Sequence, residues 1–205
     1  MGYLTFNEFQ IKTGINSEIL KKLKIYLKLI KIYQKKFNII SNKSFDSIWE
    51  RHFLDSYQII KLIGNKKKIL DIGSGAGFPA IVCAICTQNN FHLIEANKKK
   101  CLFLNKVKKI INIKNISIKN SRIENFEINR NYDYIVARAV SSLDKLIKYT
   151  HKFYKKNMSC IFMKGKTAEN EVKIAKKKFI FDVKYVNSIT DSESKILVIK
   201  NIKKK

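Results

Sequence analysis

Hydrophobic and polar positions divide this chain into an N-terminal part with helical periodicity and a longer part in which strand and helix patterns alternate. Leucine or isoleucine recurs every three or four residues between Leu20 and Ile30, with lysines on the other faces. This spacing predicts an amphipathic helix with a basic outer side. A second helix is predicted over 45–63, with Gly64 as its C-cap. We therefore expect an N-terminal helical extension over residues 1–63.

From residue 64 to residue 205, short apolar runs alternate with helical patterns. The predicted strands lie at 67–72, 91–95, 115–119, 132–137, 158–164, 179–187 and 195–201. The predicted helices lie at 78–87, 97–111, 121–125, 142–155 and 167–176. Such alternation is typical of an α/β fold with a mainly parallel sheet covered on both faces. The last two strands are close enough to pair antiparallel at one edge, and we expect 64–205 to form one compact unit.

Composition adds a charge signal. The chain of 205 residues has a formal net charge of +26, which predicts an anionic partner such as RNA or DNA, because clustered cations neutralise phosphates and release counterions. Only 4 of the 42 basic residues are arginine, and isoleucine and asparagine are abundant. Part of the charge therefore reflects A/T-rich codons.

The sequence predicts no metal site, no disulfide and no membrane-spanning segment. The histidines are scattered, and Cys83 and Cys86 form a C-x-x-C within an apolar stretch, which favours buried small hydrophobes over a zinc site. No uncharged apolar run is long enough to span a membrane, and residues 1–14 lack the apolar core and cleavage site of a leader. We expect a cytoplasmic protein, and nothing in the sequence demands more than a monomer.

Three of the seven glycines and the only proline lie between Asp71 and Pro79. This loop joins a predicted strand to a predicted helix, where backbone N–H groups at the helix start can face a nucleotide-type cofactor. The dinucleotide fingerprint needs a glycine where Phe78 stands, and no Gly-Lys-Ser/Thr follows. The period-two spacing of the glycines resembles motif I of class I S-adenosylmethionine-dependent methyltransferases. The alternative is a tight turn without a ligand.

A carboxylate follows the next strand. Glu95 comes about 20 residues after the loop, where nucleotide-binding α/β folds place an acid on the ribose hydroxyls. The carboxyl ends of both strands open into the same crevice, so the two features support each other. The alternative is a solvated glutamate at a strand end.

The position of Pro79 limits which base-methylation reactions this chain could catalyse. As the only proline, it excludes both the Asp/Asn-Pro-Pro-aromatic loop of adenine N6 methyltransferases and the Pro-Cys nucleophile of cytosine C5 methyltransferases. Arg138 instead follows the fourth predicted strand, where its planar fork suits a phosphate, a carboxylate or the edge of guanine. A bond to a neighbouring carboxylate is the alternative role. These absences favour a nucleophilic target such as guanine N7, which needs positioning but no general base.

Several segments together resemble one family. They are Glu50–Ser56, Asp71–Pro79, Glu95–Lys100 with Phe103 and Leu104, Ser121–Glu124, Ala137–Ala139 and Met163–Gly165. In consistent order from about residue 33 to 172, they are similar to the RsmG family, also called glucose-inhibited division protein B. That family methylates N7 of guanine 527 in bacterial 16S ribosomal RNA. The resemblance implies a Rossmann-like seven-stranded methyltransferase sheet with the N-terminal helical extension.

The resemblance also implies a set of site residues. Gly73 and Phe78 would contact S-adenosylmethionine in the loop, Glu95 its ribose, Ile123 and Glu124 its adenine side, and Arg138 its methionine side or the target guanine. Asp71, Gly75 and Gly77 complete the expected cofactor set. The candidates for RNA contact are Arg51, His52 and Lys164, for which helix packing and a solvated lysine are the alternatives.

The expected partner is 16S ribosomal RNA or a small-subunit particle. Two other functions remain open at this point. The chain could methylate another RNA site or a small molecule, or it could be a non-catalytic RNA-binding or ribosome-assembly protein with a vestigial loop.

Overall fold

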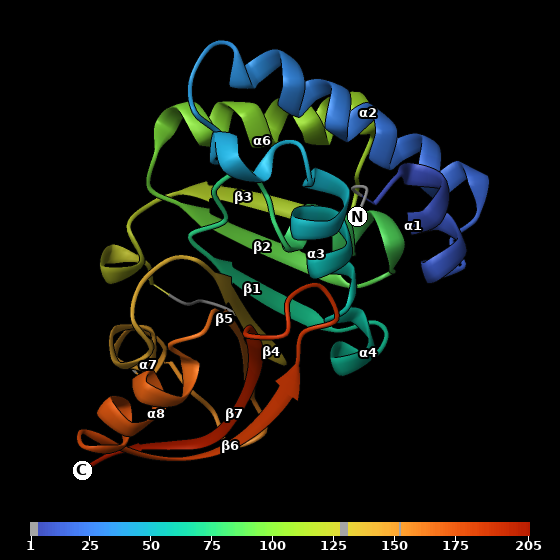
Figure 1. Cartoon of the computed structure of the whole chain (residues 1–205). Helices are drawn as coiled ribbons and strands as arrows, with labels where there is room; N and C mark the ends of the chain where they lie inside the picture. Colours follow the sequence, from blue (N-terminus) through green and yellow to red (C-terminus); the bar gives the residue numbers. More distant parts are fainter. Residues whose placement is uncertain (1–3, 128–130, 152) are drawn as a thin grey trace.

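A seven-stranded sheet forms the centre of the molecule (Figure 1). The computed structural model describes residues 4–127, 131–151 and 153–205. Its strands are β1 (Lys68–Ile72), β2 (Asn90–Glu95), β3 (Ile116–Asn120), β4 (Tyr134–Arg138), β5 (Ser159–Lys164), β6 (Phe179–Asn187) and β7 (Lys195–Lys204). In the order β3-β2-β1-β4-β5-β7-β6, the first five pair in parallel and β7 runs antiparallel between β5 and β6. The predicted α/β fold and its antiparallel edge are confirmed.

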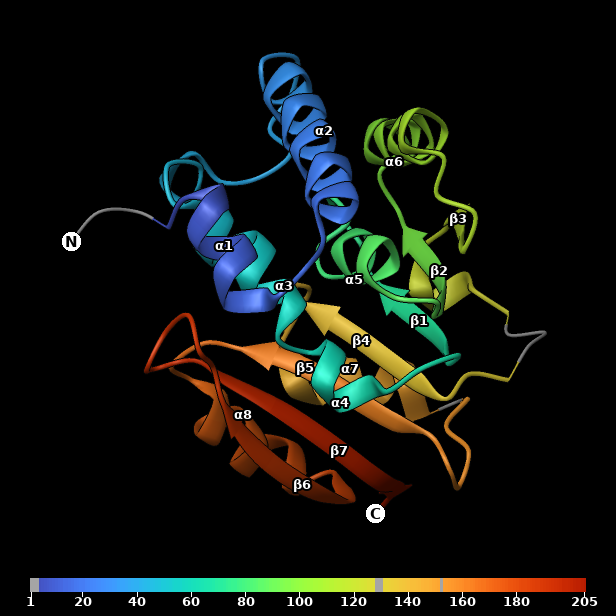
Figure 2. The same ribbon diagram turned by 90° about the vertical axis from the view of Figure 1, so that its right-hand side faces the viewer.

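Helices cover both faces of the sheet (Figure 2). They are α1 (Phe6–Thr13), α2 (Ser17–Gln34), α3 (Asp55–Tyr57), α4 (Ile60–Ile63), α5 (Ala80–Cys86), α6 (Lys98–Ile111), α7 (Leu143–His151) and α8 (Ala168–Lys176). One face carries α1, α2, α5 and α6, and the other carries α7 and α8. Among the described residues, no helix is long and apolar enough to cross a membrane.

Side chains alternate between two hydrophobic clusters along each central strand. Ile69 and Val136 belong to the cluster under α5, α6 and the N-terminal helices, whereas Leu70 and Ile135 belong to the cluster under α7 and α8. All four are fully buried. A strand that is buried on both faces has the continuous apolar run from which these strands were predicted.

Two helices predicted after residue 64 differ from the structure. The segment predicted as a helix over 121–125 is a single 3-10 turn, Ile123–Asn125 (η3). The helix predicted over 142–155 ends at His151, and residue 152 lies outside the described residues, as do residues 1–3 of the predicted extension. The loop proline, Pro79, occupies the N-cap of α5.

The predicted uninterrupted helix over 45–63 was wrong. The segment contains a π-helical turn, Trp49–Leu54 (η2), and then the short α3 and α4, after a 3-10 turn at Asn42–Ser44 (η1). In the π turn, Asp55 N–H donates to Glu50 O, five residues back. This wider turn keeps Trp49 and Phe53 buried against α1 while His52 faces the sheet. Gly64 is the C-cap that ends the segment, as predicted, and its φ is 73°.

The N-terminal helices pack directly on the glycine loop. Tyr26 of α2 is fully buried, and its hydroxyl donates a 2.5 Å hydrogen bond to Ala76 O. Its ring lies 5.3 Å from Phe78, 5.6 Å from Phe53 and 6.5 Å from Phe103, measured between centroids. Since these rings come from both parts of the chain, the extension and the sheet share one hydrophobic cluster.

Gly77 is the tightest position in this packing. Its φ is +99°, and a Cβ there would overlap Ile81 and come within 2.9 Å of Leu104 Cδ2. We predict that Gly77→Ala lowers the free energy of unfolding by about 2–3 kcal/mol. Gly14→Ala is the control, because Gly14 has φ of +68° and open space around it, so only backbone strain of about 1 kcal/mol is added. Urea unfolding measures both, and equal losses would contradict the packing argument.

Candidate cofactor and substrate site

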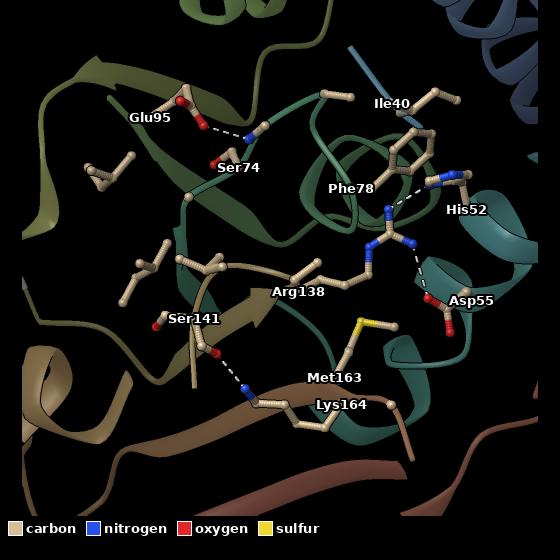
Figure 3. A pocket seen from close by; sticks show the side chains of 18 of the residues that line it. Ile40, His52, Asp55, Ser74, Phe78, Glu95, Arg138, Ser141, Met163 and Lys164 are labelled. Carbon is tan, nitrogen blue, oxygen red and sulfur yellow. Dashed lines mark hydrogen bonds and ion pairs between the residues drawn. The ribbon is translucent and has the colours of Figure 1, made fainter. Parts of the chain in front are cut away.

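The carboxyl ends of the parallel strands open into a cavity of about 1080 Å³ (Figure 3). Loops after β1, β2, β3, β4 and β5 form its floor and one wall, as expected at the crevice of an open α/β sheet. The N-terminal extension and the β6–β7 loop form the opposite wall. The lining residues come from 39–55, 72–78, 94–100, 121–124, 138–149, 163–171 and 188–196.

Most of the residues predicted from the sequence meet at this cavity. It is lined by Arg51, His52, Gly73, Gly75, Phe78, Glu95, Ile123, Glu124, Arg138 and Lys164. Asp71 and Gly77 do not line it: the first is buried at the end of β1, and the second faces Ile81 and Leu104 in the core. These two residues support the loop from beneath.

The glycine loop is fastened to β2. Gly73 and Ser74 donate their backbone N–H groups to Ile94 O at 2.8 and 3.1 Å. Gly75 N–H donates to Glu95 Oε2 at 2.8 Å, and Glu95 Oε1 accepts from Asn97 N–H at 2.7 Å. A carboxylate has about four lone-pair sites, so Glu95 retains acceptor capacity beyond these two bonds. Its role on a ribose stays a prediction.

Asp71 is a buried acid beneath the loop. Neither of its carboxyl oxygens has a hydrogen-bond partner among the described residues. Burial raises its pKa to about 8, an effect that the nearby Ser74 hydroxyl and Arg138 oppose and that Glu95 adds to. The carboxyl group is therefore mostly protonated at neutral pH.

The other end of the cavity is formed by η3 and α7. Ile123 is buried and Glu124 is exposed on this turn, and both line the cavity beside Tyr149. A hydrogen bond with Glu124 raises the pKa of the Tyr149 hydroxyl above its ordinary value. The apolar side chain of Ile123, next to the polar groups of Glu124 and Tyr149, suits a planar heterocycle such as adenine.

Arg138 lies at the centre of the cavity wall (Figure 3). One terminal nitrogen donates to Asp55 Oδ2 at 3.1 Å and to Arg51 O at 2.9 Å, and the other donates to His52 Nδ1 at 2.7 Å. The guanidinium carbon is 5.2 Å from the centroid of Phe78. The arginine thus has the bond to a nearby carboxylate that the sequence left as an alternative, and it also faces the cavity.

Lys164 is held at the end of β5, beside the loop that follows β4. Its ammonium group donates to Ser141 O at 2.5 Å and to Glu171 Oε2 at 2.8 Å, and its side chain is 9% exposed. Phosphate contact by this lysine stays a prediction.

Sequence reasoning missed part of the far wall. Ser188, Ser194 and Lys195 reach the cavity from the β6–β7 loop, and Tyr26 supports the glycine loop from α2. None of these residues stands in a motif. A tyrosine at helical spacing looks like any other core position, so no sequence signal identified it.

The donor set fits a nucleoside-type cofactor. A Cβ added to Gly75 would have only Gly73 O nearby, at 3.8 Å, so the loop backbone is open to a ligand there. Glu95 and the η3 turn line the same cavity as Gly75, and the two unpartnered oxygens of Asp71 are buried in β1. Among the described residues, no cluster of histidine, cysteine or acidic side chains could hold a metal ion.

Solved methyltransferases have this fold. A SAM-dependent methyltransferase from Aquifex aeolicus superimposes with a TM-score of 0.58 at 15% identity, covering 75% of this chain and 91% of that chain. A putative S-adenosyl-L-methionine-dependent methyltransferase from Methanococcus maripaludis gives 0.60 at 16% identity, with 78% and 91% covered. The fold is that of the class I S-adenosylmethionine-dependent methyltransferases.

Sequence comparison gives the family. The GidB family model, described as rRNA small subunit methyltransferase G, matches residues 19–200. Ribosomal RNA small subunit methyltransferase G from Rickettsia prowazekii is 41% identical over 191 residues, covering 93% of this chain and 98% of the relative. The protein of that name from Rickettsia bellii is 42% identical over 188 residues, with 91% and 96% covered. This chain belongs to the GidB family, whose cofactor is S-adenosylmethionine.

Gly75 tests the cofactor cradle. We predict that Gly75→Ala weakens S-adenosylmethionine binding at least about tenfold, because the methyl group would stand where the ligand approaches the backbone. Gly14→Ala again controls for the positive φ, since Gly14 lies outside the cavity. Isothermal titration calorimetry measures both variants. Equal affinities of the Gly75→Ala and Gly14→Ala variants would show that the glycine loop does not contact the cofactor.

Asp71 tests the buried acid. Its pKa in the folded protein is about 8, against an ordinary value of 3.8, so between these values only the unfolded chain releases the proton. Wild-type stability should therefore fall relative to Asp71→Asn by about 1.4 kcal/mol per pH unit between about pH 4 and 8, and level off above. Urea unfolding across this range gives the difference. Parallel curves for the two proteins would contradict a raised pKa.

Proposed function

We propose that this protein transfers the methyl group of S-adenosylmethionine to N7 of guanine 527 in 16S ribosomal RNA. The GidB family and its ribosomal RNA methyltransferase relatives support an RNA substrate in the small subunit. The net charge of +26 and the two exposed arginines at the cavity, Arg51 and Arg122, support a polyanionic partner. A ribosomal substrate implies that the protein works in the cytoplasm.

The observation that carries the choice of N7 is the state of the acceptors at the cavity. The titratable acceptors that line it are Asp55, Glu95, Glu124, Glu171 and His52. Each is bonded to the protein itself: Asp55 and His52 to Arg138, Glu95 to Gly75, Glu124 to Tyr149 and Glu171 to Lys164. Such bonds hold these groups in place, which supports a reaction that depends on positioning more than on a free general base.

Guanine N7 needs no such base. S-adenosylmethionine supplies an electrophilic methyl group on its sulfonium. N7 carries a lone pair and no hydrogen, so the transfer forms one N–C bond and breaks one S–C bond without moving a proton. The work of the protein is to align the two atoms and to exclude water.

The proposed roles follow the positions around the cavity. The backbone of Gly73 and Gly75 and the ring of Phe78 would border the methionine part, Glu95 would accept from the ribose, and the η3 turn with Ile123 and Glu124 would hold the adenine. Arg138 would meet the methionine carboxylate or the guanine. Arg51 has the exposed guanidinium that suits RNA phosphate, whereas His52 is committed to Arg138.

The test is to map the methylated nucleotide. Small subunits that lack the modification are incubated with the protein and labelled cofactor, and we expect one label on guanine 527, sensitive to cleavage specific for N7-methylguanine. Label on another nucleotide would overturn the assignment in favour of a different RNA site, and label on small metabolites alone would remove RNA as the substrate. A chain that binds no cofactor would instead be a non-catalytic assembly protein.

A further inference from the structure

The N-terminal extension, and not the sheet, holds the guanidinium of Arg138. All three of its hydrogen bonds within the described residues go to the segment from Arg51 to Asp55. The bonds use both hydrogens of one terminal nitrogen and one hydrogen of the other, so two of the five N–H donors are left for the cavity. Residues more than 80 positions earlier in the sequence therefore orient Arg138.

The hydrogen bonds through His52 have a fixed direction. Arginine only donates, so His52 Nδ1 must accept, and the ring carries its proton on Nε2. Nε2 lies 2.7 Å from Ser44 Oγ and donates to it, and the Ser44 hydroxyl donates in turn to Ser41 O at 2.9 Å. Burial, followed by the charges of Arg138 and Arg51, lowers the pKa of His52 to about 3. The imidazole is therefore neutral in the cell and has the one tautomer that can accept from Arg138.

Asp55 completes the hold on the arginine. Its Oδ2 accepts from Arg138, and its Oδ1 accepts from Gln58 Nε2 at 2.7 Å and from Thr190 Oγ1 at 3.1 Å. The carboxylate thus connects the end of β4 to the β6–β7 loop across the cavity. With Asp55 and Arg138 side chains 17% and 16% exposed, this ion pair is shielded from solvent.

We propose that His52 is a positioning residue, which together with Asp55 fixes the guanidinium of Arg138 in the orientation that binds the cofactor. The inference rests on the proposed function only in that Arg138 contacts the methionine side of S-adenosylmethionine. The extension is then a working part of the active site, because it orients a group that the sheet alone leaves unsupported. A purely structural role would instead use His52 to anchor Ser44.

Two substitutions separate these roles. His52→Asn places an amide oxygen near the position of Nδ1, which keeps an acceptor for Arg138 and loses the bond to Ser44. His52→Gln places its amide near the position of Nε2, which keeps a donor for Ser44 and loses the acceptor for Arg138. By calorimetry with S-adenosylmethionine alone, we expect affinity within about threefold of wild type for Asn and a loss of about tenfold for Gln.

The Arg138→Ala background is the control. If His52 acts through Arg138, the Asn and Gln variants should bind the cofactor equally once the arginine is gone. Chemical unfolding of each variant shows whether an affinity loss follows stability. Gln binding as well as Asn, or a difference that persists without Arg138, would overturn the inference.

Asp55→Asn decides the matter if neither His52 variant folds. It keeps the size of the side chain and removes the charge paired with Arg138, so we expect about a tenfold loss of cofactor affinity, and wild-type affinity would overturn the inference. The proposed function fails separately: if wild-type protein binds the cofactor but methylates another nucleotide, the role of His52 stands. If wild-type protein binds no cofactor, both fall.

Discussion

The hydrogen bonds that hold the glycine loop are the constraint on which the rest of the site depends. Residues 73–77 contain three glycines with positive φ and cannot be held by a helix or a sheet pattern. The loop is instead tied to β2 through Ile94 O and Glu95, and to α2 through Tyr26 and Ala76 O. Burial raises the pKa of the Tyr26 hydroxyl well above its ordinary value, which favours the protonated form that donates to Ala76 O. The backbone that faces the cofactor is thus fixed from both sides before any ligand arrives.

This arrangement makes the extension inseparable from the catalytic unit. Its helices supply one wall of the cavity, the hydroxyl that holds the loop and the acceptors that hold Arg138. The π turn at Trp49–Leu54 lies in this wall, where Trp49 and Phe53 are buried while His52 and the following Asp55 bond to Arg138 of β4. Such turns recur where a helix has to present side chains for function.

Much of the frame was predictable from sequence. Apolar-rich runs predicted all seven strands to within two residues at their starts. The signal is clearest in β4 and β5, because strands buried on both faces carry few competing polar residues. The glycine spacing and the position of Glu95 after the second strand predicted residues that line the cavity, because a tight loop with positive φ requires glycine. The partners of Arg138 were not predictable, since they lie 83 to 87 residues away in sequence. The same holds for Gln58 and Thr190, which meet Asp55 although Thr190 lies 135 residues away from it.

The charge balance of the site agrees with the chemistry proposed for it. Transfer of a methyl group from a sulfonium to guanine N7 moves one positive charge from sulfur to the base and leaves the total unchanged. The nearby protein groups have fixed protonation states: Asp71 is protonated, His52 is neutral, and Arg138 forms an ion pair with Asp55. None has to gain or lose a proton as the charge moves, so the electrostatic environment is the same before and after transfer. A target that had to be deprotonated would need a base, and the extension engages both His52 and Asp55 with Arg138.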